Sequence, residues 1–219
     1  MRTFVISDIH GKNDLFDKAL KEIALKRTDK LILLGDLIDR GDDSKGVLDS
    51  FIRLKETGYD ISSLMGNHEQ MLLDSFLSKK HLSLWLVNGG YKTLASFSTD
   101  SIEAIPQKYI ELIKSFNYYI EYELYIFVHA ALNMKINEPY SDLKTMLWDR
   151  NAMHHLDRNW LGDRKLIHGH NPEKLEDIKD AITNGSPVIN LDNGVYLKNE
   201  NYGALCVFEL ESSVLSIVQ

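Results

Sequence analysis

The sequence predicts an α/β domain with a mixed sheet, and the prediction depends on two features of the apolar pattern. Runs of strand length recur along the chain, at residues 3–6, 30–34, 61–65, 125–128, 165–167, 188–191 and 205–210. Amphipathic helical patterns lie between the early runs, and strands that alternate with helices are typical of α/β layers. The chain closes on a strand-rich stretch, which indicates that the sheet is mixed.

Three helices can be placed from apolar side chains at helical spacing. Residues 15–24 carry the first such stripe, and Asn13 is expected to cap that helix at its N-terminus. Residues 47–54 repeat the pattern, and Gly58 is expected to end the second helix. Pro106 suits the first turn of a third helix, whose apolar stripe reaches Ile113.

Length and composition indicate one globular domain. The chain has 219 residues, of which 44% are hydrophobic and 26% charged, and this is enough for one core of good size. No repeat or Pro- and Gly-rich linker divides it, so residues 1–219 are predicted to form a single domain. The formal net charge of −7 argues against a nucleic-acid or anionic-membrane partner, because both need clustered Lys and Arg.

The single cysteine, Cys206, excludes a disulfide framework and favours a reducing compartment. Because Cys206 lies in an apolar run with no basic neighbour, we expect it to be a buried, unreactive side chain. No run approaches the ~20 apolar residues of a membrane span, and the N-terminal apolar stretch is too short for a signal peptide. We therefore expect a cytoplasmic protein.

Polar side chains that can bind a metal or transfer a proton follow five of the apolar runs. They are Asp8 and His10, Asp36, Asn67 and His68, His129, and His168 and His170. In α/β folds, ligands gather in the loops beyond the carboxyl ends of the strands. We therefore expect these side chains to meet in one site.

The residue types and spacings predict two metal ions. Asp8 and His10 are two residues apart and project to the same side of an extended segment, and a carboxylate with an imidazole suits Mn, Fe or Zn better than Ca. Gly35 would let the backbone approach closely beside Asp36, as a bridging carboxylate requires. The first ion is expected to take Asp8, His10 and Asp36. The second is expected to take Asp36, Asn67, His129 and His170.

Charge then predicts what such a site binds. Two divalent ions bring four positive charges, whereas Asp8, Asp36 and one bridging hydroxide return three negative ones. The site stays positive inside an acidic protein, and metals ~3.5–4 Å apart suit phosphoryl transfer. Arg40 and Arg150 are candidate bidentate clamps for the phosphate, although the short motif around Arg150 also has a packing interpretation.

Three segments resemble a family signature. DIHG (residues 8–11), GDLIDRG (35–41) and GNHE (66–69) are similar to the three-part signature of the phosphoprotein phosphatase branch of the calcineurin-like metallophosphoesterases. Further segments, WLVNGG (85–90), WDR (148–150), GHNP (169–172) and LDNG (191–194), resemble the bacterial and phage members in the same order. The resemblance covers essentially the whole chain. Two departures are Ser7, where the family has glycine, and Pro172, which occupies the place of a further histidine in broader phosphoesterases.

The resemblance implies two mixed sheets in a sandwich flanked by helices, with two divalent ions at one edge, Mn first and Fe or Zn as alternatives. It implies phosphate-ester hydrolysis by a metal-bridging hydroxide without a phosphoenzyme. By the same resemblance His68 is the general acid, Asp39 orients it, and Arg40 and Arg150 bind the phosphate, to which Asn67 and His68 also contribute.

Several alternatives stay open at this stage. His168 could support a ligand from behind or simply pack beside the sheet, and His154 and His155 are expected in a solvated loop. The leading function is a serine/threonine protein phosphatase that acts on phosphoproteins or small phosphoesters. The rival is a symmetrical diadenosine tetraphosphate hydrolase with the same site, and a catalytically silent binding module is the third reading. A monomer or weak homo-oligomer is expected.

Overall fold

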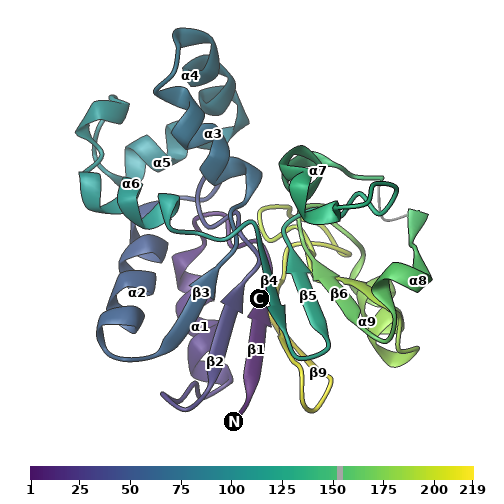
Figure 1. The fold of residues 1–219 in the computed structure, drawn as a ribbon. Coiled ribbons are helices and arrows are strands. Elements are labelled where there is room, and N and C mark those ends of the chain that lie inside the picture. Colours follow the sequence, from purple (N-terminus) through teal and green to yellow (C-terminus); the bar gives the residue numbers. More distant parts are fainter. Residues whose placement is uncertain (152–154) are drawn as a thin grey trace.

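Two mixed β-sheets face each other in the computed structural model, which describes residues 1–151 and 155–219 (Figure 1). The first sheet has the order β3-β2-β1-β8-β9, and the second has the order β4-β5-β6-β7. Strands β1 to β3 run parallel, as do β5 to β7, whereas β8, β9 and β4 pair antiparallel. The predicted mixed sandwich is confirmed.

The strands of the first sheet are β1 (Thr3–Ile6), β2 (Lys30–Leu33), β3 (Asp60–Ser63), β8 (Leu205–Glu209) and β9 (Val214–Val218). Those of the second sheet are β4 (Tyr119–Tyr122), β5 (Tyr125–Val128), β6 (Lys165–His168) and β7 (Val188–Asn190). Each of the seven predicted apolar runs overlaps one of these strands. The two strands that were not predicted, β4 and β9, are both edge strands.

The helices form three groups. Beside the first sheet lie α1 (Asn13–Glu22) and α2 (Ser44–Glu56). Beyond the strand ends rise α3 (Asn67–Ser75), α4 (Lys79–Trp85), the π-helical turn η1 (Leu86–Gly90), α5 (Tyr91–Ser96), the 3-10 turn η2 (Ile102–Ala104) and α6 (Gln107–Lys114) (Figure 1). Beside the second sheet are the 3-10 turn η3 (Pro139–Ser141), α7 (Leu143–Trp148), α8 (Arg158–Leu161) and α9 (Leu175–Thr183).

The central strands are buried on both faces, which explains their continuous apolar sequence. Successive side chains of β1 alternate, so Phe4 and Ile6 join the core under α1 and α2. Val5 points the other way, into a core shared with Phe127 and Ile167 of the second sheet. This double packing fixes where the strands end, and hence where the loops that follow them lie.

Two details of the predicted helices are wrong. Asn13 does not cap α1 but is its first residue, and it makes no capping bond because its side-chain oxygen instead accepts a hydrogen bond from the Ser50 hydroxyl at 3.2 Å. Pro106 precedes α6, which begins at Gln107, and does not lie in its first turn. The predicted end of the second helix is confirmed, because Gly58 has a φ of 86° directly after the last turn.

Other predictions concern single side chains and membrane spans. Cys206 is fully buried, and burial raises the pKa of its thiol to about 12, as expected of an unreactive residue. His155 is exposed, whereas His154 lies outside the described residues. In the described part of the chain, no helix is long and apolar enough to cross a membrane.

Candidate metal centre

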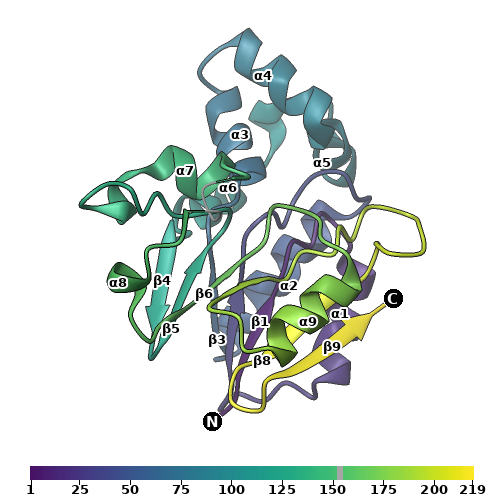
Figure 2. The same ribbon diagram turned by 90° about the vertical axis from the view of Figure 1, so that its right-hand side faces the viewer.

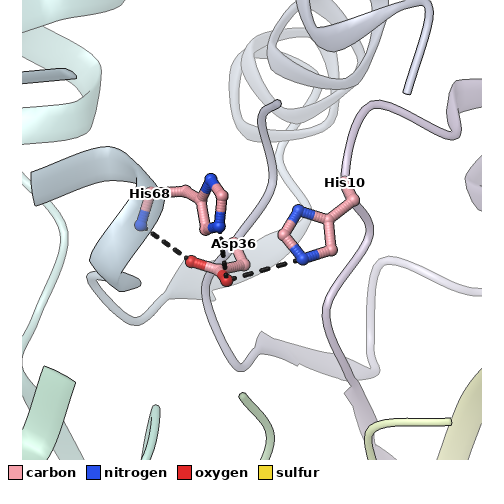
Figure 3. A group of neighbouring side chains, drawn as sticks. All are labelled: His10, Asp36 and His68. Carbon is pink, nitrogen blue, oxygen red and sulfur yellow. Dashed lines mark hydrogen bonds and ion pairs between the residues drawn. The ribbon is translucent and has the colours of Figure 1, made fainter. Parts of the chain in front are cut away.

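Asp36 lies at the centre of a buried cluster of histidines. One carboxylate oxygen is 3.6 Å from His10 Nε2 and 3.9 Å from His68 Nε2, and Figure 3 shows it between the two rings. The other oxygen is 3.5 Å from His129 Nε2. These separations exceed hydrogen-bond lengths. They approach the spacing of two ligand atoms on one ion, about 3.0–3.5 Å for bonds near 2.1 Å.

The predicted second ligand set comes together. Asp36, His129 and His170 offer ligand atoms within 4.8 Å of one another. Asn67 joins them, because its side-chain oxygen is 3.0 Å from His129 Nε2 and 2.9 Å from His170 Nδ1. His129 is oriented from behind, since its Nδ1 donates to the Leu34 carbonyl at 2.8 Å. Four side chains, three from loops and Asn67 from the start of α3, therefore point at one place.

The first predicted ligand set is brought together only in part. His10 and Asp36 lie together, but the third member of their group is His68 and not Asp8. The Asp8 carboxylate accepts the backbone N–H of His170, 3.2 Å from both oxygens. Burial raises the pKa of Asp8 well above its ordinary value, and the Asp192 and Asp36 carboxylates raise it further. Such crowded buried negative charge is stabilised by a bound cation.

Strained backbone is concentrated at this centre. Among the described residues, nine that are not glycine have a positive φ, and five of these are predicted site residues: His10, Asp36, Asp39, Arg40 and His170. The left-handed conformation costs a residue with a side chain about 1–2 kcal/mol. Strain of this kind persists where the surrounding structure enforces it, most often at functional sites.

Glu69 holds the Asp36 loop in place, a role that the sequence did not reveal. Its two carboxylate oxygens accept four backbone N–H groups, at 2.8–3.2 Å, from Asp36, Leu37, Ile38 and Gly66. Burial and the Asp36 carboxylate raise the pKa of Glu69 to about 8, whereas the four N–H donors favour its charged form. A Cβ atom at Gly66 would lie 2.2 Å from an Asp36 oxygen, so only glycine fits there.

His68 and Asp39 form a buried dyad beside the cluster. His68 Nδ1 is 2.7 Å from an Asp39 oxygen, and His68 Nε2 has no hydrogen-bond partner among the described residues. Burial opposes the imidazolium, but the Asp36 and Asp39 carboxylates together outweigh it and raise the pKa of His68. Asp39 is itself held by the Trp85 indole N–H at 2.9 Å and the Thr93 hydroxyl at 2.6 Å. Neither donor was predicted, although Trp85 belongs to the WLVNGG segment.

The two predicted arginines flank the cluster. Arg40 Nη1 is 3.0 Å from His10 Nε2, and its guanidinium lies 4.2 Å from the centre of the Tyr196 ring. Arg150 is exposed and donates to the Asn171 side chain at 3.0 Å. Neither arginine forms an ion pair with a described residue.

His168 stands outside both ligand groups. Its Nδ1 is 3.1 Å from the Gly169 carbonyl, and its side chain borders a hollow that Arg150 and Glu173 also line. Burial lowers the pKa of His168 to about 4, so the ring is neutral near pH 7. This position is compatible with both predicted roles, which are support of a metal ligand from behind and packing beside the sheet.

The fold and the site together define a phosphoesterase class. Residues 1–204 match the family described as calcineurin-like phosphoesterase, and the chain belongs to that family. It is 43% identical over 88 residues to serine/threonine-protein phosphatase 1 of Salmonella typhimurium, a match that covers 40% of this chain and 38% of that protein. It is 33% identical over 163 residues to phosphatase 2 of the same organism, with 68% of each protein covered.

Solved structures agree on the fold. A putative diadenosine tetraphosphatase aligns with a TM-score of 0.67 and 20% identity, covering 99% of this chain and 92% of that one. A protein serine/threonine phosphatase from Saccharomyces cerevisiae aligns with a TM-score of 0.66 and 13% identity, covering 100% and 80%. At these identities the likeness concerns the fold and leaves the substrate open.

Proposed function

We propose that this chain is a dinuclear, metal-dependent phosphomonoesterase that hydrolyses phosphoserine and phosphothreonine in proteins. The observation that carries the proposal is the position of Asp36, whose two oxygens face separate histidine groups. The serine/threonine phosphatase relative that matches 68% of the chain supports the substrate class.

The donor set fits two divalent ions. Carboxylate, imidazole and amide oxygen together suit Mn, and also Fe or Zn. Asp8, His10 and Asp36 would hold the first ion, as the sequence predicts. Asp36, Asn67, His129 and His170 would hold the second. Such a pair of ions, when bound, neutralises phosphoryl oxygens and makes water a stronger nucleophile.

The residues of the chain supply the remaining chemistry. His68 would protonate the leaving oxygen from Nε2, because Asp39 fixes the ring through Nδ1 and favours its charged form. Arg40 and Arg150 would hold phosphate oxygens from either side, with bidentate geometry available to each. Asn67 and His68 would complete the phosphate contacts. As part of the same proposal, the protein is cytoplasmic, and Mn is the metal proposed for both sites, ahead of Fe or Zn.

A second function keeps the same centre. Bis(5'-nucleosyl)-tetraphosphatase of Acidovorax sp. is 39% identical over 74 residues, which cover 33% of this chain and 25% of that protein. Cleavage of a dinucleoside tetraphosphate would use the same ions and arginines. The phosphatase match covers twice as much of this chain, and we therefore place the protein phosphatase first.

A substrate panel tests the choice. With Mn-loaded protein, kcat/KM should be greater for a phosphoserine peptide than for diadenosine tetraphosphate, and p-nitrophenyl phosphate should also be hydrolysed. A strong preference for diadenosine tetraphosphate would favour the second function, dinucleoside tetraphosphate hydrolysis. Absence of hydrolysis on all three substrates, with Mn content verified, would contradict both.

A further inference from the structure

A hollow of about 380 Å³ opens beside the candidate metal centre, on the side of Arg40. Its wall consists of six residues: Arg40, Val87, Asn88, Gly89, Tyr91 and Tyr196. Val87 to Tyr91 come from η1 and the start of α5, and Tyr196 comes from the loop after β7, which passes near α5 in Figure 2. Segments far apart in sequence therefore form one hollow, which we call the Arg40 hollow.

Two apolar side chains of this wall face solvent. Val87 is 81% exposed and Tyr91 is 58% exposed, and both line the Arg40 hollow, one on each side of the kink at Gly89. One exposed apolar residue is ordinary on a protein surface. Two of them around a hollow beside a candidate active site are typical of a binding surface.

The wall is fixed to the arginine. The Gly89 carbonyl accepts the backbone N–H of Arg40 at 3.4 Å, and a Cβ atom at Gly89, whose φ is 109°, would lie 2.9 Å from that nitrogen. The Tyr196 ring stacks on the guanidinium at 4.2 Å and meets the His10 ring edge-on at 4.9 Å. The hollow is therefore continuous with the cluster around Asp36.

The charges around the hollow favour one kind of occupant. Arg40 forms no ion pair within the described residues, so its charge is available beside the centre. Lys92, the next cation along α5, is already paired with Asp42 at 2.6 Å. An anion at the centre with an apolar arm reaching toward Val87 and Tyr91 would match both features. A cavity of about 150 Å³ can hold a benzene ring, so this hollow is large enough for one aromatic side chain.

We propose that the Arg40 hollow is the subsite for an apolar or aromatic side chain next to the phosphorylated residue of a protein substrate. This assignment rests on the proposed protein phosphatase function. It predicts that the chain selects among phosphopeptides by the residue beside the phosphoserine, and that Val87 and Tyr91 carry the selection. A nucleobase would be the competing occupant.

The test compares two phosphoserine peptides that differ only in the neighbouring residue, Phe in one and Ala in the other. Wild-type protein should favour the Phe peptide about five- to tenfold in kcat/KM, the gain expected from partly burying an aromatic ring. Tyr91→Ala should reduce that ratio to less than about twofold, and Val87→Ala should reduce it as well. Leu124→Ala is the matched control, because Leu124 is 59% exposed but lies in the β4–β5 turn, at the other end of the strands (Figure 1).

Each outcome separates the subsite from the function. Equal turnover of the two peptides by wild-type protein, or a Phe preference that survives in Tyr91→Ala and Val87→Ala, would overturn the subsite and leave the phosphatase function standing. If neither peptide is hydrolysed while diadenosine tetraphosphate is cleaved, the protein phosphatase function is wrong, and so is a peptide side chain as the occupant of the hollow. In that case slower dinucleotide cleavage by Tyr91→Ala, with no change in Leu124→Ala, would assign the hollow to a nucleobase.

Discussion

The hydroxyl of Thr93 offers a direct test of how the dyad is held. It is fully buried, donates to an Asp39 oxygen at 2.6 Å and accepts the Asp39 backbone N–H at 3.0 Å. Its one proton goes to the carboxylate, so the Ser44 hydroxyl, 2.9 Å away, must donate to Thr93. Valine has nearly the same shape, and Thr93→Val therefore removes these bonds without opening a cavity.

The expected cost follows from the bonds that are lost. A hydrogen bond to a charged group contributes about 1.5–3 kcal/mol, and the Ser44 hydroxyl also loses its acceptor, for a total of about 2–4 kcal/mol. The Asp39 N–H keeps its bond to Ser44 and adds nothing to this loss. For a chain of this size each kcal/mol lowers Tm by about 2–4 °C, so Tm should fall by about 4–16 °C.

The assay is thermal unfolding followed by circular dichroism at a fixed Mn concentration, because an ion that binds the native state shifts Tm. Thr183→Val is the control, since Thr183 is exposed at the end of α9 and its change should stay within about 0.5 kcal/mol. If Thr93→Val lowers Tm no more than Thr183→Val, the argument that Thr93 supports Asp39 is wrong.

Three further predictions concern the general acid, a metal ligand and the pH dependence of stability. His68→Asn should slow phosphoserine hydrolysis by about 10²–10⁴-fold. It should slow hydrolysis of p-nitrophenyl phosphate much less, because that leaving group needs no proton. Equal losses of activity on the two substrates, with unchanged Mn content, would refute the role of His68. His129→Asn should instead lower Mn content and slow both substrates alike, as metal analysis and kinetics would check. Asp29 is buried but paired with Arg2 at 2.6 Å, and these bonds lower its pKa in spite of burial. Asp29→Asn should therefore cost about 1 kcal/mol at pH 7, and urea titrations should find this difference disappearing as pH falls below about 4, since the stability from a depressed carboxyl pKa is lost in acid.

Local pattern was enough to predict the strands that lead into the site. The runs that end before Asp8, Asp36 and His129 are buried on both faces beyond their first residues, so their sequences are apolar from the second position on. The edge strand β4 (YIEY) is partly or fully exposed and pairs only with β5, and its extended conformation depends on that pairing, which the local sequence does not encode. The edge strand β9 (VLSIV) is apolar at four of its five positions, so a strand there could have been predicted from the sequence.

The sequence was enough to predict which residues form the site, but not which side chains hold those residues in place. Residue type and position after strands selected Asp36, Asn67 and His129, and these do lie together. Trp85 and Thr93 reach Asp39 from 46 and 54 residues away in sequence, so nothing near Asp39 indicates them. The grouping of His68 with His10 likewise depends on how α3 begins over the Asp36 loop, which is a tertiary feature.

The measurement that tests the central claim most directly is metal content and turnover on one preparation, with Asp36→Asn beside the wild type. Wild-type protein should lose hydrolysis of p-nitrophenyl phosphate in a strong chelator, regain it with Mn and hold about two ions per chain. Asp36→Asn should hold fewer ions and lose activity, because both predicted ions share that carboxylate. Full hydrolysis by protein verified to contain no metal, or an Asp36→Asn variant with unchanged metal content and activity, would contradict the account.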